Sequence, residues 1–381
     1  MNNLPTFKLE EYLGHYEFKA PALLCCSDGE TIEMHELLKL ASPTERKLWE
    51  ELTLGYTPVA GHPLLRTTIA QELYPTLTAE NILCFAGAEE GIFCALSALC
   101  EPADHVILVT PCYQSLLEIP RTKGCNITTL VLEEKNAWRL DLEHLAQAIT
   151  PQTKAVIINF PHNPTGQILT THEQKQLIDL LRPQGIWLFA DEVYLGLENP
   201  TAACAPAPAL SYERALSLGV MSKSFGMAGL RIGWIASQDI HVLKKIEAVK
   251  HYTSICNSAP AEILAIIALR NKEKILTTTN AITAFNQQLL DAFFIRHAEL
   301  FSWVAPRGGC TGFVRYHGPE SIDQFCTNAR EEAGILLLPG TIYDVSSPHF
   351  RIGFGRKNMP EVLQKFEEWI AERKSRRSSN D

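Results

Sequence analysis

Residues 221–233 read MSKSFGMAGLRIG, and this stretch is the best guide to the fold of the chain. Small residues flank Lys223, and Arg231 follows eight positions later. A lysine becomes a nucleophile only when burial or nearby positive charge lowers its pKa. The setting is typical of a buried lysine that forms a Schiff base with an aldehyde cofactor, with the arginine binding the phosphate of that cofactor. A surface lysine in a glycine-rich loop fits this stretch equally well.

The composition points to an ordinary globular protein. The chain has 381 residues, of which 46% are apolar and 20% charged, and two domains are expected at this length. A net charge of -9 argues against non-specific binding to nucleic acid. The sequence has no apolar run of about 18 residues, so no membrane-spanning helix is predicted. The first residues, MNNLP, lack the features of a secretion signal, and a cytoplasmic location is expected.

The cysteines and histidines predict neither a disulfide framework nor a metal site. The 11 cysteines are scattered and odd in number, which is typical of reduced core residues. Cys25 and Cys26 are adjacent, which suits neither an ordinary disulfide nor a CxxC pair. His15, His62 and His162 are isolated from one another, and no group of His and Cys residues has the spacing of metal ligands.

Short apolar runs alternate with longer amphipathic segments in the middle of the chain. Continuous apolar strands separated by helices predict a mostly parallel sheet with helices covering both faces. We therefore expect an α/β fold with a large cofactor-binding domain over residues 45–275. A smaller α+β domain is expected to combine both termini, residues 1–44 and 276–381. The strands are predicted at residues 81–85, 105–109, 155–160, 185–190 and 231–236.

Polar residues follow the ends of these strands, where open α/β sheets bind their ligands. At Ala88 and Glu89, just after Gly87, the N–H groups at the start of a helix would bind a phosphate, although a routine strand-to-helix turn gives the same pattern. Tyr113 would either lay its ring on a flat heterocycle or pack in the core. Asn163 lies in a PHNPTG turn, which either presents the amide at a strand end or is only structural.

Three further residues place polar groups in apolar surroundings. Asp191 follows the strand predicted at residues 185–190, and burying an aspartate there is costly unless it contacts a cation, such as a protonated pyridine nitrogen. Tyr194, three residues later, would donate a hydrogen bond to a phenolate oxygen on the same ring. Arg351 lies inside the apolar stretch FRIGF and needs a carboxylate partner, which either a substrate or a structural Asp or Glu would supply.

The order of these elements is more specific than any one of them. It runs from a glycine turn through an aromatic residue, Asn-Pro-x-Gly, Asp-x-x-Tyr, Ser-Lys and the arginine eight residues later to the late arginine. In this order they resemble the fold-type I pyridoxal-phosphate (PLP) enzymes, specifically the class I/II aminotransferase family. The resemblance covers the chain from about Leu54 to Gly355.

The resemblance implies a role for each matching residue around the cofactor ring. Lys223 would hold PLP as a Schiff base and later act as the base that shuttles a proton. Asp191 would keep the pyridine nitrogen protonated. Tyr194 and Asn163 would contact the phenolic oxygen, and Tyr113 would stack on the ring.

The resemblance also implies contacts to the phosphate and to the substrate. Arg231 and the backbone of Ala88 and Glu89 would hold the phosphate. Tyr56 matches a tyrosine that reaches the phosphate in the neighbouring subunit, which implies a homodimer. Arg351, together with Asn163, would bind the substrate, with the arginine on its α-carboxylate.

The chain departs from the family pattern at two places. Many members carry a phosphate-binding serine three residues before the lysine, where this chain has Val220, and Ser222 is the candidate replacement. The usual N-terminal glycine near the substrate cannot be placed in residues 25–29. The pocket for the substrate side chain is therefore not assigned from the sequence.

The activity implied is transfer of an amino group from an amino acid to a 2-oxo acid. Lyases that eliminate a β or γ group, and cyclising synthases of the cyclopropane-carboxylate or capreomycidine kind, keep the same residues and are the alternative. A non-catalytic PLP-binding regulator is a second alternative, against which the intact lysine, aspartate, tyrosine and arginines argue. An acyl-transferring enzyme is disfavoured, because such relatives usually place a histidine near Tyr194. A dinucleotide-binding dehydrogenase is disfavoured, because it needs Gly-x-Gly-x-x-Gly, which residues 85–91 do not supply.

Overall fold

The computed structural model describes residues 4–198 and 204–378, and its centre is a seven-stranded sheet. The strand order is β2-β8-β7-β6-β5-β3-β4, and within this sheet β8 is antiparallel to both neighbours while the other pairs are parallel. The predicted mostly parallel sheet is thus confirmed. Its strands are β2 (Ile82–Phe85), β3 (His105–Thr110), β4 (Asn126–Val131), β5 (Thr153–Asn159), β6 (Trp187–Asp191), β7 (Ala215–Val220) and β8 (Gly233–Ala236).

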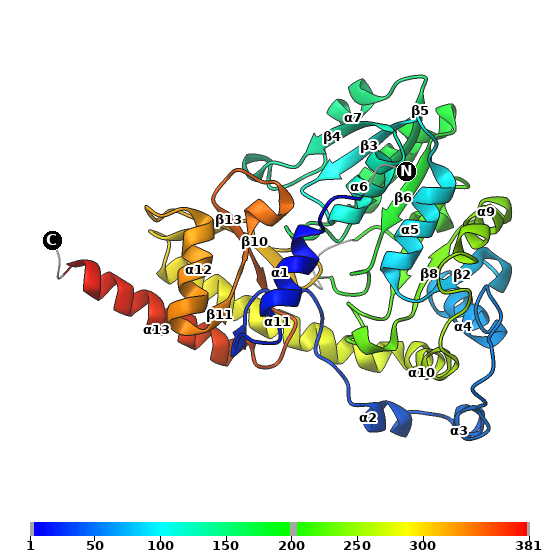
Figure 1. Cartoon of the computed structure of the whole chain (residues 1–381), viewed down its shortest axis with the longest axis horizontal. Helices are drawn as coiled ribbons and strands as arrows, with labels where there is room; N and C mark the ends of the chain where they lie inside the picture. Colours follow the sequence, from blue (N-terminus) through cyan, green and yellow to red (C-terminus); the bar gives the residue numbers. More distant parts are fainter. Residues whose placement is uncertain (1–3, 199–203, 379–381) are drawn as a thin grey trace.

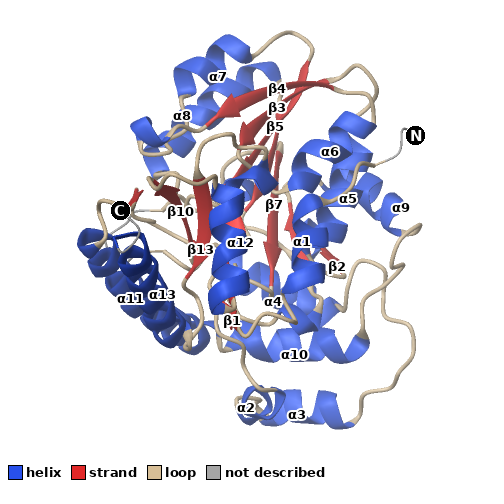
Figure 2. Ribbon diagram, turned by 60° about the vertical axis from the view of Figure 1, so that its left-hand side comes forward, coloured by secondary structure: helices blue, strands red, loops and turns tan. Residues whose placement is uncertain are grey.

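Helices cover both faces of this sheet (Figure 2), because its central strands are apolar on both sides. Along β5, Ile157 packs into one apolar cluster and its neighbours Val156 and Ile158 pack into another on the opposite face. The first face is covered by α5 (Ala88–Leu99), α6 (Gln114–Thr122) and α9 (Ile240–Lys250). The second is covered by α4 (Pro63–Leu73), α7 (Leu142–Ala148), α8 (Thr171–Leu181) and α10 (Ala259–Arg270).

A second, smaller sheet is antiparallel and has the strand order β12-β13-β10-β9. A short parallel pair, β1 with β11, joins the N-terminal segment to this region. The helix α11 (Lys272–Arg296) runs from the large sheet towards the smaller one (Figure 1). The other elements here are β1 (Ala22–Leu23), β9 (Phe301–Trp303), β10 (Thr311–Tyr316), α12 (Ile322–Ala333), β11 (Ile335–Leu336), β12 (Leu338–Pro339), β13 (His349–Gly353) and α13 (Met359–Ser378).

The N-terminal helices divide their contacts between the two regions. Helix α1 (Lys8–Tyr16) lies between them (Figure 1), whereas α2 (Met34–Lys39) and α3 (Pro43–Glu50) pack against α10. The predicted division at residues 45 and 275 stays a proposal, and α11 crosses its second boundary. Short 3-10 helices lie at Ala79–Asn81, Glu134–Asn136, Arg182–Gln184, Pro208–Leu210, Ala228–Leu230 and Gly340–Tyr343.

Two strands of the seven-stranded sheet were not predicted, and one begins later than predicted. Strand β4 lies at the sheet edge with mostly exposed or half-buried residues, so it has no continuous apolar run. In β7, Ser217 and Gly219 interrupt the apolar pattern. Strand β8 starts at Gly233 and not at residue 231, because Arg231 has a left-handed backbone with φ of 54°, which a strand cannot accommodate.

The segment after β1 lies directly against β13. The N–H of Gly353 donates a hydrogen bond to the carbonyl of Leu24 at 2.8 Å. A Cβ atom at Gly353 would lie only 1.8 Å from the carbonyl oxygen of Cys26. Only glycine allows this approach of two backbones, and the approach fixes residues 25–28 beside the end of β13.

We predict that Gly353→Ala destabilises the protein by about 1–3 kcal/mol, because the added methyl group must push residues 25–28 away from β13. Urea unfolding measures this change. Gly14→Ala is the matched control, since a Cβ atom at Gly14 meets nothing within 4 Å, and it should leave stability unchanged or raise it. Equal effects of the two substitutions would contradict the packing argument.

Candidate active site

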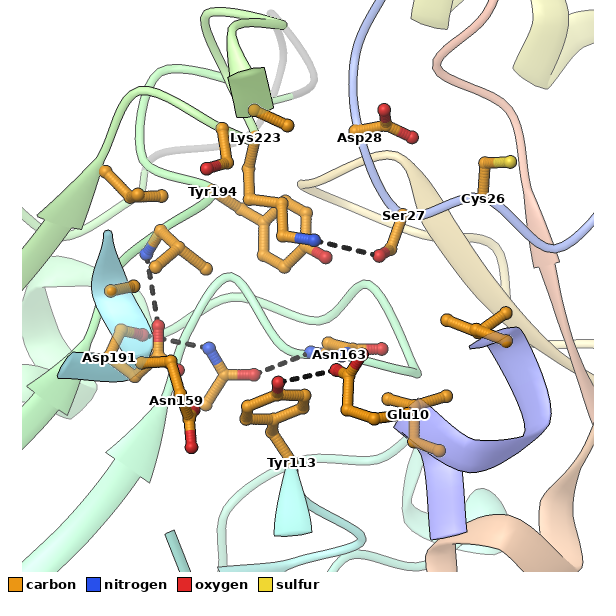
Figure 3. A pocket seen from close by; sticks show the side chains of 18 of the residues that line it. Glu10, Cys26, Ser27, Asp28, Tyr113, Asn159, Asn163, Asp191, Tyr194 and Lys223 are labelled. Carbon is orange, nitrogen blue, oxygen red and sulfur yellow. Dashed lines mark hydrogen bonds between the residues drawn. The ribbon is translucent and has the colours of Figure 1, made fainter. Parts of the chain in front are cut away.

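A cavity of about 330 Å³ opens at the carboxyl ends of the strands of the large sheet (Figure 3). Asn159, Asp191 and Val220 are the last residues of β5, β6 and β7, and all three line it. Helix α1 and residues 25–28 close the cavity from the opposite side. Ten of the residues predicted from the sequence line it together: Ala88, Glu89, Tyr113, Asn163, Asp191, Tyr194, Ser222, Lys223, Arg231 and Arg351.

Lys223 points into this cavity from the loop after β7 (Figure 3). Its Nζ donates a hydrogen bond to Ser27 Oγ at 3.0 Å and, among the described residues, forms no ion pair. Burial lowers the pKa of the lysine, and Arg351 lowers it further, while Asp28 opposes the shift. A lysine with a lowered pKa in a cavity is the form of this residue that acts as a nucleophile or base.

Asp191 places a carboxyl group at the floor of the cavity, with only 4% of the residue exposed. Burial raises the pKa of this carboxyl to about 6, although the Val193 N–H donates to Oδ1 at 3.2 Å and the charge of Lys223 favours ionisation. The amide of Asn159 donates to the main-chain carbonyl of Asp191 at 2.9 Å, and Asn159 also favours the ionised carboxyl, which partly opposes the rise in pKa. No described cationic side chain forms an ion pair with Asp191.

Arg351, in β13, is 1% exposed and is held by neutral groups. Nε and Nη2 donate to the carbonyl of Cys25 at 3.1 and 2.7 Å, and Nη1 donates to the Tyr343 hydroxyl at 2.7 Å and to Asn163 Oδ1 at 3.3 Å. The ion pairs formed by the described residues do not include Arg351. A buried guanidinium without a carboxylate is costly, so the cavity is prepared for an anionic ligand group.

The N-terminus of α5 lies at another end of the cavity. Gly87 precedes this helix with φ of 96°, and a Cβ atom on it would lie 2.4 Å from Arg231 Nη2. The absent side chain therefore lets the guanidinium lie against the first turn of α5. Free N–H groups of a helix start and an arginine together suit a phosphate. Ser222 lines the cavity nearby, and Val220 offers no hydrogen bond there.

Two tyrosines face the cavity with different surroundings. Tyr194 is 1% exposed, and its hydroxyl forms no hydrogen bond of normal geometry, although Ser27 is near enough to lower its pKa against the effect of burial. A buried hydroxyl without a partner is rare and costly, so a ligand atom is expected opposite it. The Tyr113 hydroxyl donates to Glu10 Oε1 at 2.7 Å (Figure 3), and its ring contacts Phe7.

Sequence reasoning missed several residues of the cavity. Ser27, Asn159 and Glu10 all line it, and Tyr343 holds Arg351. Asn159 could have been found as the polar end of an apolar strand. The contributions of Ser27 and Glu10 depend on tertiary contacts of the N-terminal segment, which carries no local motif.

Tyr56 lies outside the cavity and is 92% exposed. Its predicted contact across a dimer interface stays a prediction. Among residues 4–198 and 204–378, no group of His, Cys, Asp and Glu side chains could hold a metal ion. Of the described helices, none is both long and apolar enough to cross a bilayer.

The family of the chain follows from comparison with known proteins. The model of the family described as aminotransferase class I and II matches residues 36–366. The chain belongs to this family. The predicted resemblance is therefore confirmed, the protein is an enzyme, and its cofactor is PLP. This result removes the alternative of a non-catalytic regulator.

Relatives within the family have different activities. Aspartate aminotransferase from Geobacillus stearothermophilus is 30% identical over 75% of this chain and 76% of its own length. Capreomycidine synthase from Streptomyces vinaceus is 27% identical over 92% of this chain and 90% of its own length. The membership therefore shows a PLP-dependent enzyme, and the exact reaction has to be argued separately.

Solved structures agree with the fold. A PLP-dependent aminotransferase from Streptococcus suis has a TM-score of 0.90 and 28% identity, covering 97% of this chain and 98% of its own. The PLP-dependent cyclase OrfR has a TM-score of 0.88 and 25% identity, covering 98% of this chain and 99% of its own. Similar folds thus occur in relatives described as an aminotransferase and as a cyclase.

The cavity fits PLP in three independent respects. The buried carboxyl of Asp191 lacks a cation, which a protonated ring nitrogen would supply. The unpartnered Tyr194 hydroxyl matches the need of a phenolate oxygen for a donor. The cradle of Gly87 and Arg231 at the start of α5 suits a phosphate.

The buried carboxyl of Asp191 should cost stability when PLP is absent. Its pKa in the folded protein, about 6, is above the ordinary value of an aspartate. Its contribution to the stability of the folded protein is therefore full below pH 4, where this carboxyl is neutral, and that contribution is lost as the pH rises through 6 and the buried group ionises. We predict that PLP-free Asp191→Asn is more stable than the wild type above pH 7, on the order of 2 kcal/mol. The difference should disappear towards pH 4.

Urea unfolding of the PLP-free proteins between pH 4 and 8 measures this difference. Asp179→Asn is the control, because the exposed Asp179 carboxylate is paired with Lys175, so its replacement should not stabilise the protein above pH 7. A difference for Asp191→Asn that does not change with pH would contradict the burial argument.

Proposed function

We propose that this protein is an aminotransferase that moves an amino group from an amino acid to a 2-oxo acid. The proposal rests above all on Arg351, a buried guanidinium that lacks a carboxylate partner in the same cavity as Lys223. Amino and 2-oxo acids share a carboxylate next to the reacting carbon. One arginine therefore serves both halves of a transfer reaction.

The proposed roles around the cofactor follow from the surroundings of each residue. PLP supplies an aldehyde carbon and a ring that withdraws electrons from the substrate. Asp191 would keep a proton on the ring nitrogen, which its burial beneath the cavity supports. The Tyr194 hydroxyl and Asn163 would contact the phenolic oxygen, and the ring of Tyr113 would stack on the pyridine.

Lys223 is proposed to hold the cofactor and then to move the proton. Its lowered pKa favours the neutral amine, which is the form that accepts a proton from the α-carbon of the substrate. The hydrogen bond from Nζ to Ser27 Oγ at 3.0 Å sets the direction of the amine. Arg351 fixes the substrate carboxylate, and Tyr343 and Asn163 orient its guanidinium.

The phosphate is proposed to lie at the start of α5. The N–H groups of Ala88 and Glu89, the guanidinium of Arg231 and the hydroxyl of Ser222 would bind it. We further propose a cytoplasmic homodimer in which Tyr56 of the partner subunit completes this contact. The exposure of 92% for Tyr56 supports this role, because a large exposed aromatic is available to a partner.

Reduction of the PLP-loaded protein with borohydride should attach the cofactor to the peptide that contains Lys223, as measured by mass spectrometry. Lys223→Arg keeps the charge but cannot form this bond, and we expect turnover to fall at least about 100-fold because the base is lost. Lys244→Arg, an exposed lysine paired with Glu247, is the control and should keep its activity. An adduct on any other lysine would overturn the assignment.

A second candidate function is elimination or cyclisation on the same residues. The observation that favours it is the length of the match to capreomycidine synthase, 92% of this chain, together with the TM-score of 0.88 to a PLP-dependent cyclase. All residues proposed above would serve either reaction, since both begin with removal of a proton from the α-carbon.

Dependence on a 2-oxo acid should separate the two reactions. A transferase keeps the amino group on its cofactor, so product formation should stop after one equivalent per active site until pyruvate or 2-oxoglutarate is added. A lyase or cyclase should continue without either acid. We expect the first behaviour, with 2-oxo acid product quantified by mass spectrometry, and sustained release of ammonia or of a cyclic product would refute the transferase.

A further inference from the structure

The cavity contains more carboxyl groups than the proposed chemistry uses. Its lining includes three cationic side chains, and the proposed function engages all of them. Lys223 holds the cofactor, Arg231 binds the phosphate and Arg351 binds the α-carboxylate. Five carboxyl side chains line the same cavity, and Asp191 alone is assigned to the cofactor. The other four are Glu10, Glu17, Asp28 and Glu89.

Two of these four carboxyl groups are compensated within the protein. Asp28 accepts two hydrogen bonds from Arg356 at 2.9 and 3.0 Å, and the two form an ion pair. Glu89 accepts a hydrogen bond from Ser115 at 2.9 Å, and burial raises its pKa to about 7. Both are thus partly or fully neutralised without any ligand.

Glu10 and Glu17 are not compensated in this way. Neither is among the ion pairs of the described residues. They are seven residues apart, with Glu17 capping the end of α1, and they line the cavity together with Leu9 and Leu13. These residues therefore mark the side of this segment that faces the cavity. The carboxylate of Glu10 accepts the Tyr113 hydroxyl at 2.7 Å, which leaves further acceptor positions unused.

The position of Glu10 brings it close to the reacting groups. In Figure 3 it points towards Tyr113 and Asn163, on the side of the cavity opposite Asp191. Its charge also favours the protonated form of Lys223 and so acts across the cavity. A substrate whose carboxylate lies on Arg351 would therefore extend its side chain towards α1.

Within one subunit, the described residues that line the cavity include no further cation for a second carboxylate. Its lysine and arginines are all engaged by the cofactor or by the α-carboxylate, so an acidic side chain would face Glu10 and Glu17 without a partner. Like charges in one cavity repel, and opposite charges attract. The buried Arg351 and the unpartnered Tyr194 hydroxyl mark this same cavity independently as a ligand site.

We propose that the amino donor has a cationic side chain, a guanidinium or an ammonium group, and that Glu10 binds it with Glu17 as the outer partner. This inference rests on the proposed function, since it names the substrate class of the same site. A guanidinium suits Glu10 well, because its planar donors match a carboxylate in a paired geometry. Leu9 and Leu13 would contact the methylene groups of the side chain.

Arginine and citrulline form the matched pair of donors that tests this proposal, because they are nearly equal in shape and differ in charge. We expect kcat/KM for arginine to exceed that for citrulline at least tenfold at low salt. Glu10→Gln should lower this ratio at least fivefold. Glu11→Gln removes a charge from the same helix turn but lies outside the cavity, and it should keep the ratio of the wild type.

Binding without turnover keeps this test separate from the proposed function. Titration of the PLP-loaded protein with each amino acid in the absence of a 2-oxo acid is followed by the visible absorbance of the cofactor. Tighter binding of arginine that Glu10→Gln abolishes supports the substrate class, even if the later products are those of a lyase or cyclase. Stronger binding of citrulline, norvaline or glutamate than of arginine overturns it, as does an equal loss for arginine and citrulline in Glu10→Gln.

Discussion

Asp191 and Arg351 are buried groups of opposite charge, and neither forms an ion pair with another described residue. The rest of the site depends on this arrangement. The fold uses its hydrogen bonds to orient these groups: Val193 fixes the carboxylate, and the carbonyl of Cys25 fixes the guanidinium. Asp191 comes from the large sheet and Arg351 from the small one. The two sheets therefore have to stay packed together for the cavity to have both charges.

Close backbone contacts maintain this packing at the points where side chains would interfere. Gly353 allows the segment that carries Ser27 to lie directly on β13, and this segment also supplies the carbonyl of Cys25 to Arg351. Gly87 plays the same part at the other end of the cavity, where it admits the guanidinium of Arg231. Gly353 thus helps to position Arg351 on its own strand, β13, whereas Gly87 makes room for Arg231, which lies on a distant part of the chain.

The sequence was sufficient to predict the site residues that follow strands. It was insufficient to predict the site residues that are positioned by contacts between distant parts of the chain. Asp191 and Asn163 follow predicted strands, whereas Lys223 was predicted from the small residues around it and from Arg231 eight positions later. The structure brings all three predicted site residues to one cavity. The edge strand β4 lacked an apolar run, and β7 was interrupted by Ser217 and Gly219. Glu10 could not be inferred, because helix α1 reaches the site only through tertiary packing.

The residues proposed for the chemistry and the residues proposed to select the substrate therefore come from different parts of the chain. The groups proposed to act on the cofactor come from strand ends of the large sheet and from the start of α5. The charge that would face a substrate side chain comes from α1, a single nine-residue helix that rests between the two sheets. Substitutions on the cavity side of α1 can alter the electrostatics for the donor while the backbone of Asp191 and Lys223 is untouched. A common fold is therefore compatible with relatives that are named for quite different reactions.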